Sequence, residues 1–261
     1  MKKIIFAVLF IQSFAMSVQG QDLSLYQKKW FIKDNDTLPY RLLLPLNYDA
    51  SKKYPLILFL HGAGERGSDN ELQLVHGSGL FLRDSVRQKY PAIVVMPQCA
   101  LNSFWSNVQF KMDSTGFREF IFREGGDPTK SMELLLQLFK KIVKEYPVDK
   151  KQLYVGGLSM GGMGTFEMVR RNPGVFAAAF PICGGGATGT AAKMKDVNWW
   201  IFHGDADAVV PPKLSQEMVD ALKAAGAPVK FTLYPGVNHN SWDNAFVEPD
   251  LVPWLFSNKR K

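Results

Sequence analysis

An apolar run in this chain leads directly into a serine that is flanked by glycines: Gln152-Leu153-Tyr154-Val155-Gly156-Gly157-Leu158-Ser159-Met160-Gly161-Gly162. The run Gln152–Gly156 predicts a buried strand, and residues Ser159–Asn172 predict a helix that ends before Pro173. A Gly-x-Ser-x-Gly pattern between a strand and a helix is typical of a nucleophile elbow, a tight turn that exposes the serine hydroxyl. The N-terminus of the helix also favours negative charge that develops beside it. Ser159 is therefore the predicted nucleophile.

Short apolar runs recur on both sides of this segment. They are Tyr54–Leu60, Ala92–Met96, Ala177–Ile182, Trp199–Phe202 and Lys230–Tyr234. Strands that are apolar at every position are buried on both faces, as in parallel sheets covered by helices. Amphipathic helices are expected between them at Pro128–Tyr146 and Pro211–Ala225. The alternation predicts an α/β fold with a mostly parallel central sheet and helices on both faces.

The N-terminal part of the chain carries two further signals. Gln27–Lys33 and Leu38–Pro45, joined by a polar turn, predict an antiparallel hairpin through which the chain enters the sheet. Before them, two lysines precede a short apolar stretch over residues 4–15, which is the layout of a secretory signal peptide. A membrane anchor would need about 20 apolar residues. We expect a signal peptide over residues 1–20, one catalytic domain over residues 21–261, and a secreted or periplasmic protein without stable membrane insertion after cleavage.

Composition and charge narrow the class of protein further. The 261 residues are 46% hydrophobic and 21% charged, as in an ordinary soluble globular protein. The net charge is +7, but Lys and Arg are scattered along the chain, so nucleic-acid binding is not expected. Cys99 and Cys183 are either a disulfide pair or two free buried thiols, and they do not support a zinc site. No metal or organic cofactor is expected, and nothing in the sequence specifies an oligomeric state.

A serine nucleophile needs a base, and the chain has four histidines. His61 and His203 directly follow buried strands and precede glycine, where a histidine more often braces a loop. His76 falls in an expected helix without a visible partner. His239 lies in the loop after the last strand, at the edge of the sheet where catalytic groups of α/β proteins gather. We expect His239 to be the base.

The acid and the oxyanion-binding groups come from other loops. Asp205 and Asp207 follow the strand Trp199–Phe202, and either could orient the imidazole of the base. A tetrahedral intermediate needs two donors for its oxyanion. One is the backbone N–H of Met160, directly after the nucleophile, and the other comes from the glycine-rich loop after an earlier strand, with Ala63 the first candidate and Gly64 the next.

Several motifs in sequence order give the chain a resemblance to the α/β-hydrolase superfamily. They are Leu60–Gly67, Gly157–Gly162, His203–Asp207 and His239. The chain looks most like secreted bacterial carboxylesterases of the phospholipase/carboxylesterase and dienelactone-hydrolase-like group, which is related to polyhydroxybutyrate-depolymerase-like and feruloyl esterases. The resemblance covers residues 38–257. It implies Ser159 as nucleophile, His239 as base and, because the family pattern reads HGxxD, Asp207 rather than Asp205 as acid. Dienelactone hydrolases proper carry a cysteine where this chain has Ser159.

The predicted activity is that of a secreted serine carboxylesterase, which hydrolyses short-acyl or carbohydrate- and feruloyl-type esters through an acyl-enzyme. The alternatives are a small serine peptidase of the prolyl-oligopeptidase-like type and a non-catalytic binding protein with the hydrolase fold. Only residues 184–197 separate two strands where many lipases insert a lid, so no large lid is expected. The aromatic segment Cys99–Asp127 is either a packed surface loop or a pocket wall. Trp105 and Trp242 are candidate substrate-binding residues, with core or surface positions as the alternative.

Overall fold

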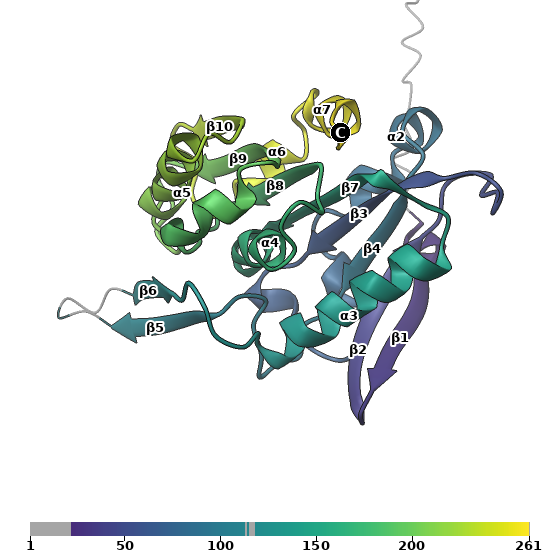
Figure 1. The fold of residues 1–261 in the computed structure, drawn as a ribbon, viewed down its shortest axis with the longest axis horizontal. Coiled ribbons are helices and arrows are strands. Elements are labelled where there is room, and N and C mark those ends of the chain that lie inside the picture. Colours follow the sequence, from purple (N-terminus) through teal and green to yellow (C-terminus); the bar gives the residue numbers. More distant parts are fainter. Residues whose placement is uncertain (1–21, 113, 115–117, 261) are drawn as a thin grey trace, which may run out of the picture.

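The computed structural model describes residues 22–112, 114 and 118–260, so the predicted signal peptide, residues 1–20, lies outside the described residues. The central sheet has eight strands: β1 (Gln27–Lys33), β2 (Asp36–Leu43), β3 (Tyr54–Leu60), β4 (Ile93–Pro97), β7 (Val148–Leu158), β8 (Ala178–Ile182), β9 (Asn198–Gly204) and β10 (Val229–Tyr234). Their spatial order is β1-β2-β4-β3-β7-β8-β9-β10 (Figure 1). Strand β2 runs antiparallel to both of its neighbours, and the other pairs are parallel. The predicted sheet and its N-terminal hairpin are confirmed.

Helices cover both faces of this sheet, as predicted. The α-helices are α1 (Ser78–Leu82), α2 (Asp84–Lys89), α3 (Lys130–Glu145), α4 (Met160–Arg171), α5 (Lys213–Ala224), α6 (Trp242–Ala245) and α7 (Leu251–Ser257). Side chains of α3, α4 and α5 belong to one buried apolar cluster, and those of α1, α6 and α7 to a second. Short 3-10 helices occupy Leu23–Leu25, Ala63–Glu65, Leu72–Leu74 and Thr188–Met194.

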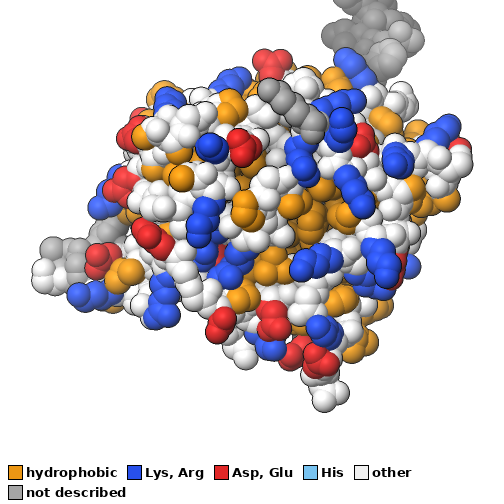
Figure 2. Space-filling model, in the orientation of Figure 1, with side chains coloured by type: hydrophobic (Ala, Val, Ile, Leu, Met, Phe, Trp, Pro, Cys, Tyr) orange, Lys and Arg blue, Asp and Glu red, His pale blue; other side chains and the backbone are white. Residues whose placement is uncertain are grey.

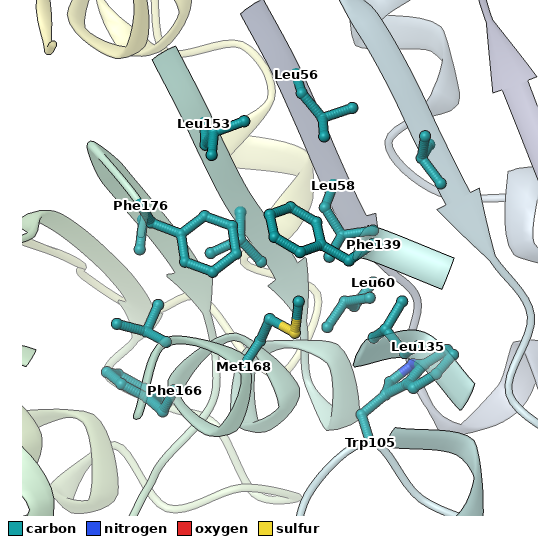
Figure 3. Close-up of a cluster of buried hydrophobic side chains, with 14 of the residues drawn as sticks. Leu56, Leu58, Leu60, Trp105, Leu135, Phe139, Leu153, Phe166, Met168 and Phe176 are labelled. Atoms are coloured by element: carbon teal, nitrogen blue, oxygen red, sulfur yellow. The ribbon is translucent and has the colours of Figure 1, made fainter. Parts of the chain in front are cut away.

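The two clusters explain why the central strands are apolar at consecutive positions. Side chains of a strand alternate between its faces. In β3, Leu56, Leu58 and Leu60 therefore join the cluster under α3 and α4, which Figure 3 shows, while Ile57 and Phe59 join the cluster under α1 and α7. Because both faces are covered, the strand has no position at which a polar side chain would reach water.

The aromatic segment after β4 forms a separate ribbon. Its strands β5 (Val108–Met112) and β6 (Arg118–Phe122) pair antiparallel and extend away from the body of the molecule (Figure 1). Between β8 and β9, where a lid would be inserted, the chain forms the 3-10 helix Thr188–Met194, which packs against α5.

The outer surface is chemically mixed. On the face shown in Figure 2, Lys and Arg side chains are interspersed with Asp, Glu and small apolar areas. Within the described ranges, no helix has both the length and the apolar character that a membrane span requires.

Candidate active site

The turn between β7 and α4 holds Ser159 in an unusual backbone conformation. Its φ is 54° and its ψ is −116°, outside the regions that non-glycine residues favour. Two hydrogen bonds fix this turn, from Ser159 N–H to the Ile182 carbonyl at 2.9 Å and from Met163 N–H to the Ser159 carbonyl at 3.0 Å. At Gly161 a β-carbon would lie only 1.9 Å from the carbonyl oxygen of Leu60. The glycine is required because the turn passes directly against the end of β3.

The structure brings the three predicted side chains into one hydrogen-bonded chain. Ser159 Oγ lies 3.0 Å from His239 Nε2, and His239 Nδ1 lies 2.7 Å from Asp207 Oδ2. Asp207 and His239 stand in the loops after β9 and β10, and the carboxyl ends of parallel strands meet at one edge of the sheet. A carboxylate only accepts, so His239 Nδ1 carries the proton and Nε2 is left to accept from the serine hydroxyl. This arrangement suits proton transfer from Ser159.

Asp207 is held as a carboxylate by four donors. Its Oδ1 accepts from the backbone N–H groups of Val209 at 2.8 Å and Val210 at 2.9 Å, and its Oδ2 accepts from His239 and, at 3.1 Å, from His203. Burial alone would raise the pKa of Asp207. The hydrogen bonds from His203, His239 and the two amides outweigh that effect and hold the pKa of this carboxyl well below its usual range.

His203 and Asp205 have roles beside this carboxylate. His203 is fully buried, and its Nε2 faces both Asp207 Oδ2 and the Val210 carbonyl at 2.9 Å. Both are acceptors, so Nε2 carries a proton. The sequence indicated only a loop brace at His203, and its position four residues before Asp207 was the signal for this contact. Asp205 instead accepts from the Gly236 N–H at 2.6 Å and braces the loop that leads to His239.

Two backbone amides beside Ser159 are available for an oxyanion. Ala63 and Met160 are the first residues of a 3-10 helix and of α4, and both line the same cavity as Ser159. Among the described residues, none accepts a hydrogen bond from either amide. Amides at the start of a helix lack an internal acceptor, so they can bind an anion there.

His61 fixes the loop that carries Ala63. Its Nε2 accepts from the Cys99 N–H at 2.9 Å, and its Nδ1 donates to the Gly62 carbonyl at 2.6 Å. Burial lowers the pKa of His61 to about 4, so the ring is neutral and ties the ends of β3 and β4 together. The histidine is therefore a brace for the loop that carries Ala63.

Ser159 opens into a cavity of about 560 Å³ with a largely apolar lining. The aromatic segment Cys99–Asp127 supplies one wall, formed by Phe104, Phe110, Met112 and Phe120. Of the two alternatives for this segment, the structure therefore shows the pocket wall. Sequence reasoning did not single out these side chains individually, although the density of aromatic residues was a signal for them.

The two candidate tryptophans have different positions. Trp242 lines the cavity, and its ring meets that of His239 edge-on with centroids 5.4 Å apart. Trp105 is fully buried with its ring against that of His61, it belongs to the apolar cluster under α3 and α4 (Figure 3), and it does not line the cavity. This corrects the prediction that Trp105 contacts substrate, because its indole fills the space beside the helix layer.

A second correction concerns His76. It lies in a bend between the 3-10 helix Leu72–Leu74 and α1, outside any helix, and it lines the cavity. It also has partners. Its ring centroid is 5.2 Å from that of Trp242, and its Nε2 is 3.8 Å from Glu65 Oε1. The sequence offered no signal for these contacts, because Trp242 is far from His76 along the chain and Glu65 lies in a different loop.

The cysteines are free thiols, and neither belongs to a metal site. Both are buried, and burial raises the pKa of the Cys99 thiol to about 11 and that of Cys183 further. Within the described ranges, one group of possible ligands lies close together, formed by Cys183, Asp207 and His239, with ligand atoms within 4.8 Å of one another. Asp207 and His239 already bond to each other, and a thiol that resists deprotonation is a poor metal ligand. The donor set therefore does not fit a metal ion.

Comparison with curated proteins finds partial relatives. A probable feruloyl esterase C from Aspergillus terreus is 26% identical over 172 residues, which are 66% of this chain and 56% of that protein. A bifunctional acetylxylan esterase/xylanase from Neocallimastix patriciarum is 29% identical over 117 residues, which are 42% of this chain and 17% of that protein. The chain thus spans about half the length of the first relative and less than a fifth of the second.

Similar solved structures and a family model agree with the fold. A thermostable esterase has a TM-score of 0.80 and 34% identity, covering 91% of this chain and 64% of that one. A ferulic acid esterase with 18% identity has a TM-score of 0.63, covering 88% of this chain and 96% of that one, and it shows the fold alone. A model described as Phospholipase/Carboxylesterase matches residues 47–248, which is most of the chain. The chain therefore belongs to the phospholipase/carboxylesterase family of α/β hydrolases.

Proposed function

We propose that this chain is a secreted serine carboxylesterase that hydrolyses short-acyl or carbohydrate- and feruloyl-type esters through an acyl-enzyme intermediate. The observation that carries the proposal is the hydrogen-bonded chain Ser159–His239–Asp207 opening on an apolar cavity of about 560 Å³. The names of the relatives, among them a feruloyl esterase and an acetylxylan esterase, support an ester as substrate. The signal-like residues 1–20 support secretion.

Acylation begins when Ser159 Oγ attacks the carbonyl carbon of the ester. The hydroxyl proton moves to His239 Nε2, while Asp207 holds the other ring nitrogen and stabilises the imidazolium. The carbonyl oxygen becomes an oxyanion and takes hydrogen bonds from the amides of Ala63 and Met160, each worth about 3 kcal/mol to the transition state. The bond to the leaving oxygen then breaks, and His239 gives its proton to the departing alcohol.

Deacylation repeats these steps with water as the nucleophile. His239 takes a proton from the water as it attacks the acyl carbon, and the same two amides hold the second oxyanion. The bond from Ser159 Oγ to the acyl group breaks, the serine recovers its proton from His239, and the carboxylic acid leaves. Every proton is carried by His239 and both oxyanions are held by backbone amides, so this mechanism uses groups of the chain itself and water.

The proposal is tested by hydrolysis of p-nitrophenyl acetate, p-nitrophenyl octanoate and methyl ferulate, with Ser159→Ala beside the wild type. Ser85→Ala is the matched control, because Ser85 is an exposed residue of α2. We expect turnover in the wild type and the control, and its loss in Ser159→Ala. Turnover that persists in Ser159→Ala would contradict the assigned nucleophile, and cleavage of p-nitroanilides without ester turnover would favour a peptidase. The mass of the N-terminus after export tests the signal peptide.

A further inference from the structure

One corner of the cavity is polar, in contrast to the aromatic wall. This polar corner consists of Glu65, His76 and Trp242. The Glu65 side chain is only 13% exposed, and among the described residues no donor makes a hydrogen bond of ordinary length to either of its carboxylate oxygens. A buried carboxylate without hydrogen bonds is costly. The position therefore calls for a donor that the described chain does not itself supply.

The two oxygens of this carboxylate differ in their access to a ligand. Oε2 is fully buried, and a β-carbon on Gly62 would lie 2.9 Å from it and 3.7 Å from the β-carbon of Ser159. This oxygen is therefore buried against the loop that carries Gly62 and Ala63, close to Ser159. Oε1 is nearer to His76, whose side chain is 33% exposed and also lines the cavity. Compensation for the buried carboxylate must come through Oε1.

The gap between Glu65 and His76 matches a single hydroxyl group. Oε1 and His76 Nε2 are 3.8 Å apart, which is too long for a direct hydrogen bond. One oxygen placed about 2.8 Å from each atom would donate to the carboxylate and accept from the imidazole N–H. A hydroxyl both donates and accepts, so it satisfies the two side chains together.

The polar corner lies on the side of the cavity where the leaving alcohol must be. His239 protonates the leaving oxygen in the proposed mechanism, so that oxygen lies beside His239 Nε2. The His239 ring contacts Trp242, the Trp242 ring contacts His76, and His76 faces Glu65. These contacts connect the leaving-group position continuously to the gap at Glu65.

We propose that Glu65 and His76 are specificity-determining residues that bind a hydroxyl group on the alcohol part of the ester, next to the scissile bond. Trp242 lies between them and His239 and covers the carbon skeleton of the alcohol. The favoured substrates are then esters of alcohols that carry a further hydroxyl group near the ester oxygen, with simple alkyl esters disfavoured. This inference rests on the proposed esterase function and assigns the alcohol half of its substrate.

The test compares two esters that differ by one hydroxyl. 2-Hydroxyethyl butanoate and propyl butanoate have the same acyl group and nearly the same size, and release of butanoate measures kcat/KM for each. We expect the wild type to prefer the hydroxyl ester by about tenfold or more, since tenfold is near the lower end of what a hydrogen bond to a charged group contributes. In Glu65→Ala the ratio should fall to about one, and in Glu65→Gln and His76→Ala it should lie between these values. Glu217→Gln, at an exposed position of α5, is the control and should keep the wild-type ratio.

Each outcome decides between this inference and the function on which it rests. Equal kcat/KM for the two esters in an active wild type would overturn the inference and leave the esterase intact. A preference for the hydroxyl ester that survives in Glu65→Ala would also overturn the inference, because other residues would then bind the hydroxyl group. Butyrylcholine and 3,3-dimethylbutyl butanoate differ only in the charge of the alcohol part. If the wild type preferred butyrylcholine by a larger factor than it prefers the hydroxyl ester, and Glu65→Ala lost that preference, Glu65 would bind a cation and the inference would be wrong. Absence of turnover on every ester would refute the proposed function itself.

Discussion

Replacing Asp207 by asparagine should disable His239 as a base while the loop keeps its shape. The N–H groups of Val209 and Val210 both point at Oδ1, so the amide oxygen of Asn must occupy that position. The amide nitrogen then takes the place of Oδ2, which faces His239 Nδ1 at 2.7 Å. Since two N–H groups cannot face each other, His239 must move its proton to Nε2. That nitrogen then points a proton at Ser159 Oγ and cannot accept one.

The size of the effect follows from this change of tautomer. In a Ser-His-Asp triad, the wrong tautomer lowers kcat by about 10⁴, which corresponds to about 5 kcal/mol in the activation barrier. A second consequence is structural, because His203 Nε2–H loses its acceptor at Oδ2 and keeps only the Val210 carbonyl. Loss of a buried hydrogen bond to a charged group costs about 1.5 to 3 kcal/mol of stability.

The assay is kcat/KM with p-nitrophenyl acetate, together with thermal unfolding to show that the variant is folded. Asp205→Asn is the matched control, two residues earlier in the same loop. Asp205 only accepts one hydrogen bond, from the Gly236 N–H, and an asparagine oxygen can accept it equally well. We expect Asp205→Asn to stay within about threefold of the wild type. A loss below tenfold in folded Asp207→Asn, or an equal loss in both variants, would refute the reasoning.

Three further predictions concern the elbow, the aromatic wall and acid stability. Gly161→Ala places a β-carbon 1.9 Å from the Leu60 carbonyl oxygen and should lower the free energy of unfolding, measured by denaturant titration, by about 3 kcal/mol. Gly125→Ala is the control and should change this free energy little, because no atom lies within 4 Å of the added β-carbon. Equal effects of the two substitutions would contradict the crowding at Gly161. Phe120→Ala removes part of the wall and should lower the octanoate-to-acetate ratio of kcat/KM by about tenfold, and an unchanged ratio would place the acyl chain elsewhere. Because the pKa of folded Asp207 lies below its unfolded value of 3.8, the carboxylate stabilises the fold fully at neutral pH, and this contribution is lost as the pH falls from about 5 toward the folded pKa. In thermal unfolding, the stability advantage of wild type over Asp207→Asn should therefore stay level from pH 7 to about pH 5 and shrink from there to pH 3. A constant difference down to pH 3 would speak against the linkage.

The architecture was predictable because its signals are local. A run that is apolar at every position, such as Tyr54–Leu60, indicates a strand buried on both faces. The apolar period of Pro128–Tyr146 indicates a helix buried on one face, and neither signal depends on distant residues. The elbow at Ser159 is also local, since its backbone turn and its glycines lie within five residues. Most bounds shifted by one or two residues, and the strand expected at Gln152–Gly156 begins four residues earlier, at Val148. Helix ends depend on caps: α3 begins at Lys130, after Thr129 caps it through the Met132 N–H.

The sequence could not tell which of several similar side chains line the cavity, because that depends on contacts in the folded structure. Trp105 and Trp242 looked equivalent as sequence, but Trp105 fills the helix layer and Trp242 lines the cavity. His76 looked like part of a helix, but it lines the cavity with its ring against that of Trp242. In each case the deciding neighbour is distant along the chain, so no local pattern can reveal it.

The mostly parallel sheet, the helices on its two faces and the sharp serine turn follow from local signals, because the hydrophobic period and the placement of glycines act over a few residues. Which side chains meet at the site depends on the packing of segments that are far apart in the chain. His239 is 80 positions from Ser159 and 32 from Asp207, and the three are joined because neighbouring parallel strands end at one edge of the sheet. The packing of separate loops also decided the aromatic wall and the polar corner, since Phe104 and Phe120 and the ring pair His76 and Trp242 meet only in the folded chain.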